Sequence, residues 1–316
     1  MLKKLTIVDI ARLSGVGKST VSRVLTNDPK VKPETREKVE KVIAENGFVP
    51  SKSAQLMRGG SQKVIGVIIS RLDSPSENKV VGSILNTLYA AGYDVVVMES
   101  QFNKEKTNEH LDVLKKRNVD GVIVFGFTDC DLKKIEEWQH KAIVIALDTQ
   151  NTSSINYDNH GIIQLAFDHL RQQGVNNIAY LGVDPKDKTT GEMRLNAYLI
   201  QCQLHGVTPC YQTGQLNHES AYQLIDELVT PDTHAIICAS DTIAFGAIKR
   251  LQEINREEIA ITGVGGNALL SFLFPNIYSI NPGYAEAGES AAKQLIAQLS
   301  GESTVTHLIQ APLLSS

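Results

Sequence analysis

The chain has 316 residues, of which 42% are hydrophobic and 21% are charged, with a formal net charge of −4. This length and apolar content allow a small N-terminal domain and a core of two lobes. The sequence has no apolar run of about 18 residues and no apolar signal segment at its start, so we expect neither a membrane protein nor an exported one. A cytoplasmic location follows from these expectations.

Charge is distributed unevenly along the chain. Residues 1–63 hold thirteen Lys or Arg and six Asp or Glu, a net charge of +7, so the remaining residues carry −11 of the total of −4. A basic segment attracts the phosphate backbone of nucleic acid, and particular side chains must then read the bases. The pattern favours a DNA-binding N-terminus over the alternative of a solvated basic helical bundle.

Residues 5–25, LTIVDIARLSGVGKSTVSRVL, have the pattern of a helix-turn-helix. Thr6 followed by Asp9 predicts a capping box, and Gly15 ends the first helix. The apolar contacts of this helix are expected from Ile7, Ile10, Ala11 and Leu13. In the second helix Val21, Val24 and Leu25 share the inward face. The residues predicted to contact DNA are Thr6, Lys18, Ser19, Thr20, Ser22 and Arg23.

A third helix is predicted to begin near Pro33 and to pack Val39, Val42 and Ile43 against Phe48. Residues 1–49 then form a three-helix head that holds one helix outward toward a DNA groove.

The segment GVGKST at 15–20 ends like a phosphate-binding loop. That motif needs a glycine where Arg12 stands, and it needs a preceding strand, whereas the preceding segment is helical in pattern. We therefore do not expect nucleotide binding here.

Residues 50–62 are predicted to form a hinge helix and linker. Pro50 ends the preceding segment, and Gly59 stops a helix that is marginal by itself. A flexible linker is the simpler interpretation. We favour a hinge that folds on DNA, with Lys52 as a further contact and with Leu56 and Met57 as apolar wedges in the minor groove.

From residue 63 to 316, buried-type strands alternate with amphipathic helices. The strands are predicted at 64–70, 95–99, 121–127, 142–147, 177–183, 235–240 and 259–264. The helices are predicted near 77–91, 104–116, 131–140, 160–174, 191–205, 217–229 and 242–253. Two such series predict an α/β core of two doubly wound lobes. The boundaries are an N-lobe of about 63–157 and 283–301 and a C-lobe of about 158–282 and 302–316.

Polar residues follow the predicted strands, where ligands bind in such sheets. The candidate ligand residues are Arg71, Glu77, Asp148, Thr190, Gly191, Arg194, Asp241, Asn267 and Tyr284. Thr190 and Gly191 open a helix whose free N–H groups are expected to meet an anion. Arginines and short polar side chains suit a polyhydroxy ligand with an anionic group, although each residue alone also fits a helix cap or a loop.

An enzyme is the competing class. The sequence lacks GxSxG, HExxH and a GxGxxG after the first core strand, so we assign no catalytic residue and expect no enzymatic activity. The four cysteines and eight histidines show no metal-ligand spacing, and we expect free thiols, no metal and no cofactor.

Together the residues of 5–25, ETREKV at 34–39 and GFVPSKSAQLMRG at 47–59 resemble the LacI/GalR family of bacterial transcription repressors. The likeness runs over essentially the whole chain. It implies a helix-turn-helix head, a hinge helix, a core like that of periplasmic sugar-binding proteins, and a homodimer on a palindromic operator. By position, Lys18, Ser19 and Arg23 match the family's base-reading residues, and Met57 matches its minor-groove wedge, which is usually leucine.

Within that family the core is most similar to the regulators of trehalose operons, through residues 68–78, 95–102, 180–198 and 281–288. This likeness implies trehalose 6-phosphate as the inducer. Arg71 and Arg194 would bind the phosphate near Thr190 and Gly191, and Glu77 would orient Arg71. The sugar hydroxyls would be held by Asp148, Asp241, Asn267 and Tyr284.

Two positions depart from the pattern of these relatives. Leu147 stands where they carry an arginine, and Asn267 stands where the family usually has an aspartate, which removes one charge that would repel a phosphate. The alternatives are a regulator of the same kind that responds to another sugar or sugar phosphate, such as a fructose phosphate, and a sugar sensor whose DNA head is vestigial.

Overall fold

The computed structural model describes residues 5–25, 28–48 and 62–312. The chain divides into two compact units, residues 1–62 and residues 63–316.

The first unit contains the three predicted helices, α1 (Ile7–Ser14), α2 (Lys18–Leu25) and α3 (Pro33–Glu45). The backbone N–H of Thr6 donates to Asp9 Oδ2 over 2.9 Å, and the backbone N–H of Asp9 donates back to the Thr6 hydroxyl, which forms the predicted capping box. Gly15 ends α1 in the left-handed conformation at φ 64°. A helix therefore precedes Lys18, which rules out the strand that a phosphate-binding loop requires.

The helices pack around a small apolar core. Its buried members are Ile10, Ala11, Val21, Val24, Val39 and Phe48. The prediction that Leu13 joins this core was wrong, because its side chain is 49% exposed. One residue later, Ser14 takes the inward position a full turn after Ile10 and donates its hydroxyl to the Ile10 carbonyl over 2.6 Å.

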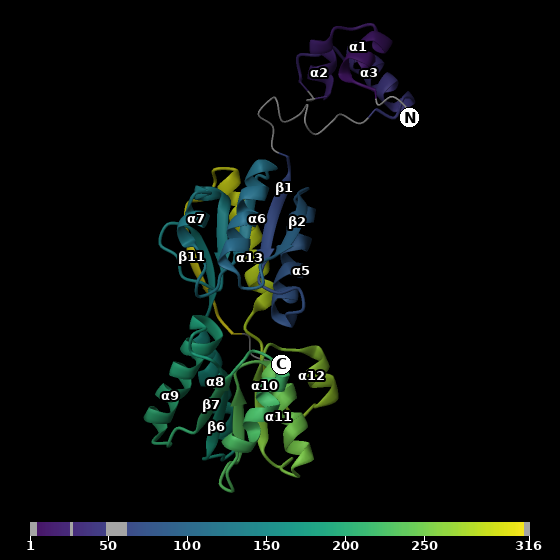
Figure 1. The fold of residues 1–316 in the computed structure, drawn as a ribbon. Helices are drawn as coiled ribbons and strands as arrows, with labels where there is room; N and C mark the ends of the chain where they lie inside the picture. The colour runs from purple at the N-terminus through teal and green to yellow at the C-terminus, as the bar shows by residue number, and fades with distance from the viewer. Residues whose placement is uncertain (1–4, 26–27, 49–61, 313–316) are drawn as a thin grey trace. The chain divides into compact units, whose positions relative to one another are not determined.

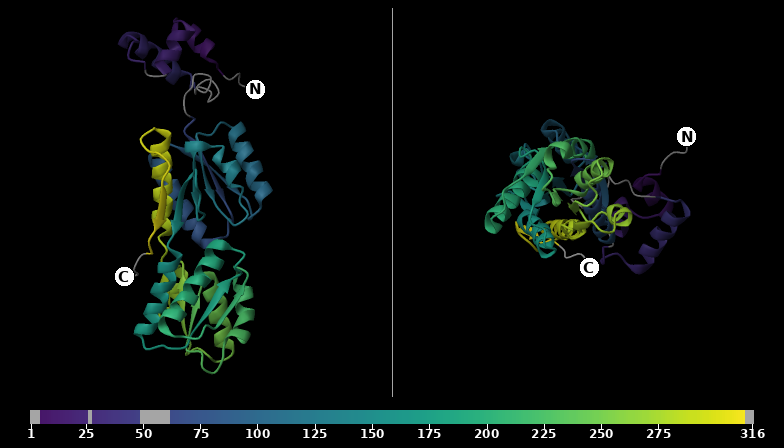
Figure 2. Two further views of the ribbon diagram at one scale, coloured as in Figure 1. Left: turned by 90° about the vertical axis from the view of Figure 1, so that its left-hand side faces the viewer. Right: turned by 90° about the horizontal axis from the view of Figure 1, so that it is seen from below.

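The second unit holds two parallel sheets, one in each lobe (Figure 1). The N-lobe sheet has the order β11-β5-β4-β3-β1-β2. Its strands are β1 (Val64–Ile69), β2 (Asp94–Glu99), β3 (Gly121–Phe125), β4 (Ala142–Ile145), β5 (Ser153–Tyr157) and β11 (His307–Gln310). Its helices are α5 (Pro75–Ala90), α6 (Lys104–Lys116), α7 (Leu132–Glu136), a 3-10 turn at Gln139–Lys141, and α13 (Tyr284–Leu299). One apolar cluster joins α5 and α13 to one face of the sheet, and a second joins α6 and α7 to the other (Figures 1 and 2).

The C-lobe sheet has the order β10-β9-β8-β6-β7. Its strands are β6 (Ile178–Val183), β7 (Tyr211–Gly214), β8 (Ala235–Cys238), β9 (Ala260–Val264) and β10 (Tyr278–Ile280). Its helices are α8 (Asn159–Gln172), a π-helical turn at Lys188–Met193, α9 (Arg194–His205), α10 (His218–Leu228), α11 (Asp241–Glu253) and α12 (Ala268–Leu273). α8 packs beside α9, and α10 packs beside α11 (Figure 1).

All seven predicted core strands are present with small boundary shifts, and the predicted fold class is confirmed. Four further strands were not predicted from the sequence, because they are short or polar, namely β5, β7, β10 and β11. One lobe boundary needs correction, since β11 pairs with β5 in the N-lobe sheet rather than lying in the C-lobe. Its largely exposed sequence HLIQ carries no buried-strand signal.

Within the part of the chain that the structure describes, no helix has the length and apolar character needed to cross a membrane. The same residues contain no cluster of side chains arranged to hold a metal ion. All four cysteines are free thiols.

Two helical glycines give a matched test of packing. A Cβ on Gly246 in α11 would lie 2.1 Å from the His218 carbonyl oxygen, whereas one on Gly82 in α5 would meet nothing within 4 Å. We expect Gly246→Ala to lower the free energy of unfolding by about 1–3 kcal/mol through overpacking. Gly82→Ala should raise it by roughly 0.5–1 kcal/mol, because alanine loses less backbone entropy in a helix. Urea unfolding measures both, and changes of the same sign would contradict the packing of α10 against α11.

Candidate functional site

The outer face of α2 presents the side chains predicted to contact DNA. Lys18 and Ser19 are exposed in its first turn, and Thr20 and Ser22 are half-buried. Arg23 is exposed and lies 3.9 Å from the Asp28 carboxylate. Val21 and Val24 anchor the opposite face in the head core. A cationic end and small hydroxyl side chains on one short helix can enter a major groove and donate hydrogen bonds to bases and phosphates.

Thr6 has a structural role in the head. Its hydroxyl donates to Asp9 Oδ2 over 2.7 Å as part of the capping box, while the residue stays exposed. The hinge residues Lys52, Leu56 and Met57 lie outside the described residues.

A cavity of about 510 Å³ lies between the two lobes of the core. Its walls come from segments that follow the carboxyl ends of β1, β3, β4 and β6, together with the start of α13. A smaller adjoining hollow of about 50 Å³ shares several of these residues and adds the segments after β8 and β9. The predicted residues that line one or both are Arg71, Glu77, Asp148, Thr190, Arg194, Asp241, Asn267 and Tyr284. Gly191 is buried and lines neither.

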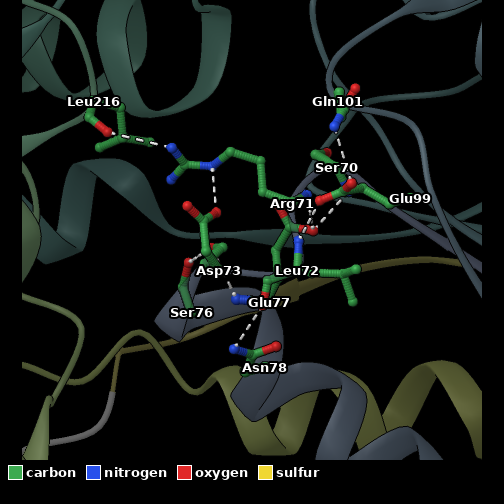
Figure 3. A network of polar contacts seen from close by, with 11 residues as sticks. Ser70, Arg71, Leu72, Asp73, Ser76, Glu77, Asn78, Glu99, Gln101 and Leu216 are labelled. Atoms are coloured by element: carbon green, nitrogen blue, oxygen red, sulfur yellow. Dashed lines mark hydrogen bonds and ion pairs between the residues drawn. The ribbon is translucent and has the colours of Figure 1, made fainter.

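Arg71 extends from the end of β1 toward the C-lobe (Figure 3). Its Nη1 donates to the Leu216 carbonyl over 3.5 Å, and its Nε lies 3.7 Å from Asp73 Oδ1, too far for a hydrogen bond. That Nε is buried without a hydrogen-bond partner. The guanidinium also lies 5.8 Å from the centre of the Phe102 ring. A buried donor beside a polar cavity points to an acceptor supplied by a ligand.

Glu77 contacts Arg71 through its backbone N–H rather than its guanidinium, and the role of Glu77 in orienting Arg71 stays a prediction. Its Oε2 accepts the backbone N–H of Ser70 over 2.7 Å and that of Arg71 over 3.3 Å. The Arg71 guanidinium reaches across to Leu216 instead. Burial raises the pKa of Glu77 to about 7, although the two N–H groups and the charge of Arg71 act against this rise.

The sequence predicted free N–H groups at the helix start formed by Thr190 and Gly191, and this prediction was wrong. Asp187 Oδ1 accepts the backbone N–H groups of Thr189, Thr190 and Gly191 over 2.9, 2.8 and 3.3 Å. This carboxylate already compensates the positive end of the turn, so it takes the place of an anionic ligand. Thr190 still lines the cavity.

Arg194 lies at the start of α9 and is only 3% exposed. Its Nε donates to Asn159 Oδ1 over 2.8 Å and its Nη1 donates to the Ala239 carbonyl. These bonds tie α9 to α8 and to the end of β8. Arg194 thus contributes charge to the cavity wall while much of its hydrogen-bonding capacity is used by the fold.

Asp241 and Asn267 brace each other at the ends of β8 and β9. Asp241 is 4% exposed, and its two oxygens accept the backbone N–H of Asn267 and the hydroxyl of Ser279, each over 2.7 Å. Burial raises the pKa of Asp241, and these two hydrogen bonds oppose the rise. The Asn267 side chain caps α12 by accepting N–H groups of Leu269 and Leu270.

Asp148 and Tyr284 complete the predicted set on the N-lobe side. Asp148 Oδ1 accepts the side-chain amide of Asn156 over 2.6 Å, and Tyr284 packs edge-on against Tyr157 with ring centres 5.1 Å apart. An aromatic wall beside a hydrogen-bonded carboxylate can bind a sugar ring and its hydroxyl groups.

Hydrogen bonds cross from lobe to lobe around the cavity. Lys79 Nζ on α5 donates to the carbonyl oxygens of Gly265 and Gly266 after β9. The Thr128 hydroxyl, after β3, donates to the Lys186 carbonyl over 3.0 Å and accepts the backbone N–H of Lys188 over 3.1 Å. With the bond from Arg71 to Leu216, these contacts fix the lobes in the arrangement seen here.

Several cavity residues were missed from sequence. They include Phe102, Phe127, Asn156, Tyr157, Asn159, Asp187 and Lys188. The cap formed by Asp187 carries a recognisable signal, because an aspartate begins the segment DKTTG before a helical pattern. The others lie on loops, inside strands or, for Asn159 and Lys188, at the first residue of a helical segment, where spacing alone does not mark a ligand residue.

Comparisons with known proteins agree with this geometry. Residues 6–51 match the model for bacterial regulatory proteins of the lacI family, and residues 62–312 match the model for periplasmic binding proteins and the sugar binding domain of the LacI family. The HTH-type transcriptional regulator TreR of Escherichia coli K12 is 47% identical over 309 residues, which cover 98% of this chain and 98% of that protein.

Solved structures are similar as well. The trehalose repressor from Escherichia coli superposes with a TM-score of 0.78 at 42% identity and covers 80% of this chain and 99% of that chain. The lac repressor bound to ONPG in its repressed state has a TM-score of 0.86 and covers 99% of both chains. Its identity of 22% shows a shared fold alone.

The raised pKa of Glu77 gives a test by pH. Its carboxyl ionises near pH 4.5 when unfolded and only near pH 7 when folded, so its contribution to stability is lost as the pH rises between these values. Glu77→Gln removes this titration while keeping an oxygen acceptor. We expect the free energy of unfolding of the variant, relative to that of the original chain, to increase by up to about 3 kcal/mol as the pH rises from about 4 to 8. Urea unfolding of both proteins across that range measures the difference, and a difference independent of pH would contradict the burial of this carboxyl.

Proposed function

The chain belongs to the LacI family of bacterial regulatory proteins, and from this premise we propose that it represses genes for trehalose uptake and utilisation and releases their operator on binding trehalose 6-phosphate. The effector binds in the cavity between the lobes. The observation that carries the proposal is the Nε of Arg71 in the wall of that cavity, which is buried, makes no hydrogen bond and has the Asp73 carboxylate 3.7 Å away. It is a donor positioned for an anionic group, in a chain 47% identical to TreR.

The shape and lining of the cavity support a sugar phosphate. A volume of about 510 Å³ lies in the range of small-molecule sites, roughly 300–1,000 Å³. Phe102, Tyr157 and Tyr284 offer flat apolar surfaces for sugar rings, and Asp148 and Asn156 offer acceptors and donors for hydroxyl groups. At the neighbouring hollow, Asn267 is uncharged, so it does not repel a phosphate.

In the repressing state, two copies of the chain form a homodimer on a palindromic operator. Each α2 enters a major groove, where Lys18, Ser19 and Arg23 contact bases and phosphates. Residues 50–62 link this head to the core. Since the operator lies in the cytoplasm, the repressor acts there.

Induction follows from differential binding. An effector that favours one arrangement of the lobes shifts the population away from the arrangement that binds DNA. A coupling free energy of about 1–3 kcal/mol lowers operator affinity roughly 5- to 150-fold.

A different sugar or sugar phosphate is the alternative effector for the same cavity. An enzymatic role has less support. Glu77 and Asp187 in the cavity and Asp241 in the adjoining hollow accept backbone N–H groups. Burial raises the pKa of the Cys130 thiol to about 11, which keeps it protonated and unreactive. The proposed repressor has no catalytic residue and no cofactor.

The recognition helix is tested by removing its cations. Lys18→Ala with Arg23→Ala should weaken binding to an operator selected from random DNA by at least about tenfold and relax its sequence preference, because each base contact discriminates by roughly 1–3 kcal/mol. Lys41→Ala, on the exposed side of α3, is the control and should change affinity by less than about threefold. Fluorescence anisotropy at fixed salt measures both. Undiminished binding by the double variant would remove α2 from the DNA interface.

The effector is tested by calorimetry on the full chain. Trehalose 6-phosphate should bind at least about tenfold more tightly than trehalose, since charge-assisted hydrogen bonds to a phosphate add about 1.5–3 kcal/mol. Fructose 6-phosphate serves as the competing sugar phosphate. Equal affinities for trehalose and its 6-phosphate would show that the cavity does not bind a phosphate, and tighter binding of fructose 6-phosphate would favour the alternative effector.

A further inference from the structure

We propose that Lys188 is the specificity-determining cation for the anionic group of the effector, and that Thr128 positions it from the opposite lobe. This inference rests on the proposed function of the cavity and names how that cavity distinguishes a sugar phosphate from a neutral sugar.

Three permanently cationic side chains line the cavity, namely Arg71, Lys188 and Arg194. Arg194 is nearly fully buried and donates to Asn159 and to the Ala239 carbonyl, so the fold uses it. Arg71 bonds to the Leu216 carbonyl and lies beside the Asp73 carboxylate. Neither arginine is wholly available to a ligand.

Lys188 differs from both arginines. It lies at the start of the turn that leads into α9, and it is exposed. Among the residues that the structure describes, no hydrogen bond or ion pair is made by its ammonium group. An exposed, compact cation in the wall of a cavity can approach a phosphate without giving up an existing partner.

The cavity also contains carboxylates that oppose an anion. Asp148, Asp158 and Asp187 line it, together with Glu77, whose carboxyl is only partly ionised near neutral pH because burial raises its pKa to about 7. Each accepts hydrogen bonds within the protein: Asp158 from the backbone N–H of Gly161, Asp187 from three backbone N–H groups, and the other two as described above. Their negative charge disfavours a bound phosphate unless cations outweigh it, so the binding of an anionic sugar depends on each available cation. A neutral sugar has no such requirement.

Thr128 fixes the position of the Lys188 backbone. Its hydroxyl both accepts the Lys188 backbone N–H and donates to the Lys186 carbonyl. Thr128 follows β3 in the N-lobe, whereas residues 186–188 follow β6 in the C-lobe. The position of the Lys188 backbone is therefore tied to the arrangement of the two lobes, and a ligand held by Lys188 acts on that arrangement directly.

The charge is tested with Lys188→Gln, and with Lys186→Gln as the matched control, because Lys186 lies on the same loop but does not line the cavity. Calorimetry with trehalose 6-phosphate and with trehalose measures affinity on the full chain. We expect Lys188→Gln to lose at least about tenfold in affinity for trehalose 6-phosphate, as for a lost charge-assisted hydrogen bond, and to keep its affinity for trehalose. Lys186→Gln and the charge-conserving Lys188→Arg should stay within about threefold of the original chain.

The positioning role is tested with Thr128→Val and Thr128→Ser. The valine removes the hydroxyl at nearly equal volume and should lower affinity for trehalose 6-phosphate by about threefold or more, while the serine keeps the hydroxyl and should restore it. Undiminished affinity in Thr128→Val would contradict the positioning role, and a loss in Thr128→Ser alone would show that the methyl group, which valine keeps, matters rather than the hydrogen bonds.

The outcomes separate this inference from the proposed function. If the original chain prefers trehalose 6-phosphate and Lys188→Gln retains that preference, the role of Lys188 is wrong and the proposed function stands. If the original chain shows no preference for the phosphate, both are wrong. Equal losses for trehalose and its 6-phosphate in Lys188→Gln would mean that the residue shapes the cavity without reading charge.

Discussion

Parallel strands place their carboxyl ends at one edge of a sheet, and in this core the edges of two sheets face a single cavity. Every strand-end side chain in the cavity is therefore positioned by one of two rigid lobes. The chemistry of the site depends on how the lobes face each other, because Arg71 comes from one lobe and Arg194 from the other. The affinity of a ligand that contacts both arginines depends on the arrangement of the lobes, and its binding changes the relative free energies of the possible arrangements.

The hydrogen bonds between the lobes are made by residues at or beside the cavity. Arg71 reaches the Leu216 carbonyl, Lys79 reaches the Gly265 carbonyl, and Thr128 holds the backbone of Lys188. Under the proposed function, ligand recognition and lobe arrangement share the same groups. A phosphate bound by the Arg71 guanidinium under that function would compete with the Leu216 carbonyl for it, which gives a physical route from an occupied cavity to a changed core.

Much of this architecture could be predicted from sequence, because long β-branched runs such as 64–70 and 121–127 leave little choice but buried parallel strands. The capping box at Thr6 was equally clear. The strands β5 and β11 were missed since their sequences are partly polar, and they form through pairing with a neighbour.

The site was predictable only in part. Strand-end positions identified Arg71, Asp148 and Asp241 as residues near the cavity. They did not show that Asp187 already satisfies the N–H groups of Thr190 and Gly191, or that Glu77 contacts Arg71 through its backbone N–H. Those contacts depend on side-chain directions in three dimensions, which spacing along the chain does not specify.

The central claim, that an occupied cavity weakens operator binding, is tested most directly by reciprocal titration. Operator affinity is measured with and without saturating trehalose 6-phosphate, and the affinity for trehalose 6-phosphate is measured with and without saturating operator. Thermodynamic linkage predicts that both affinities fall by the same factor, about 5- to 150-fold. Operator affinity that is unchanged or increased by a bound effector would contradict the account.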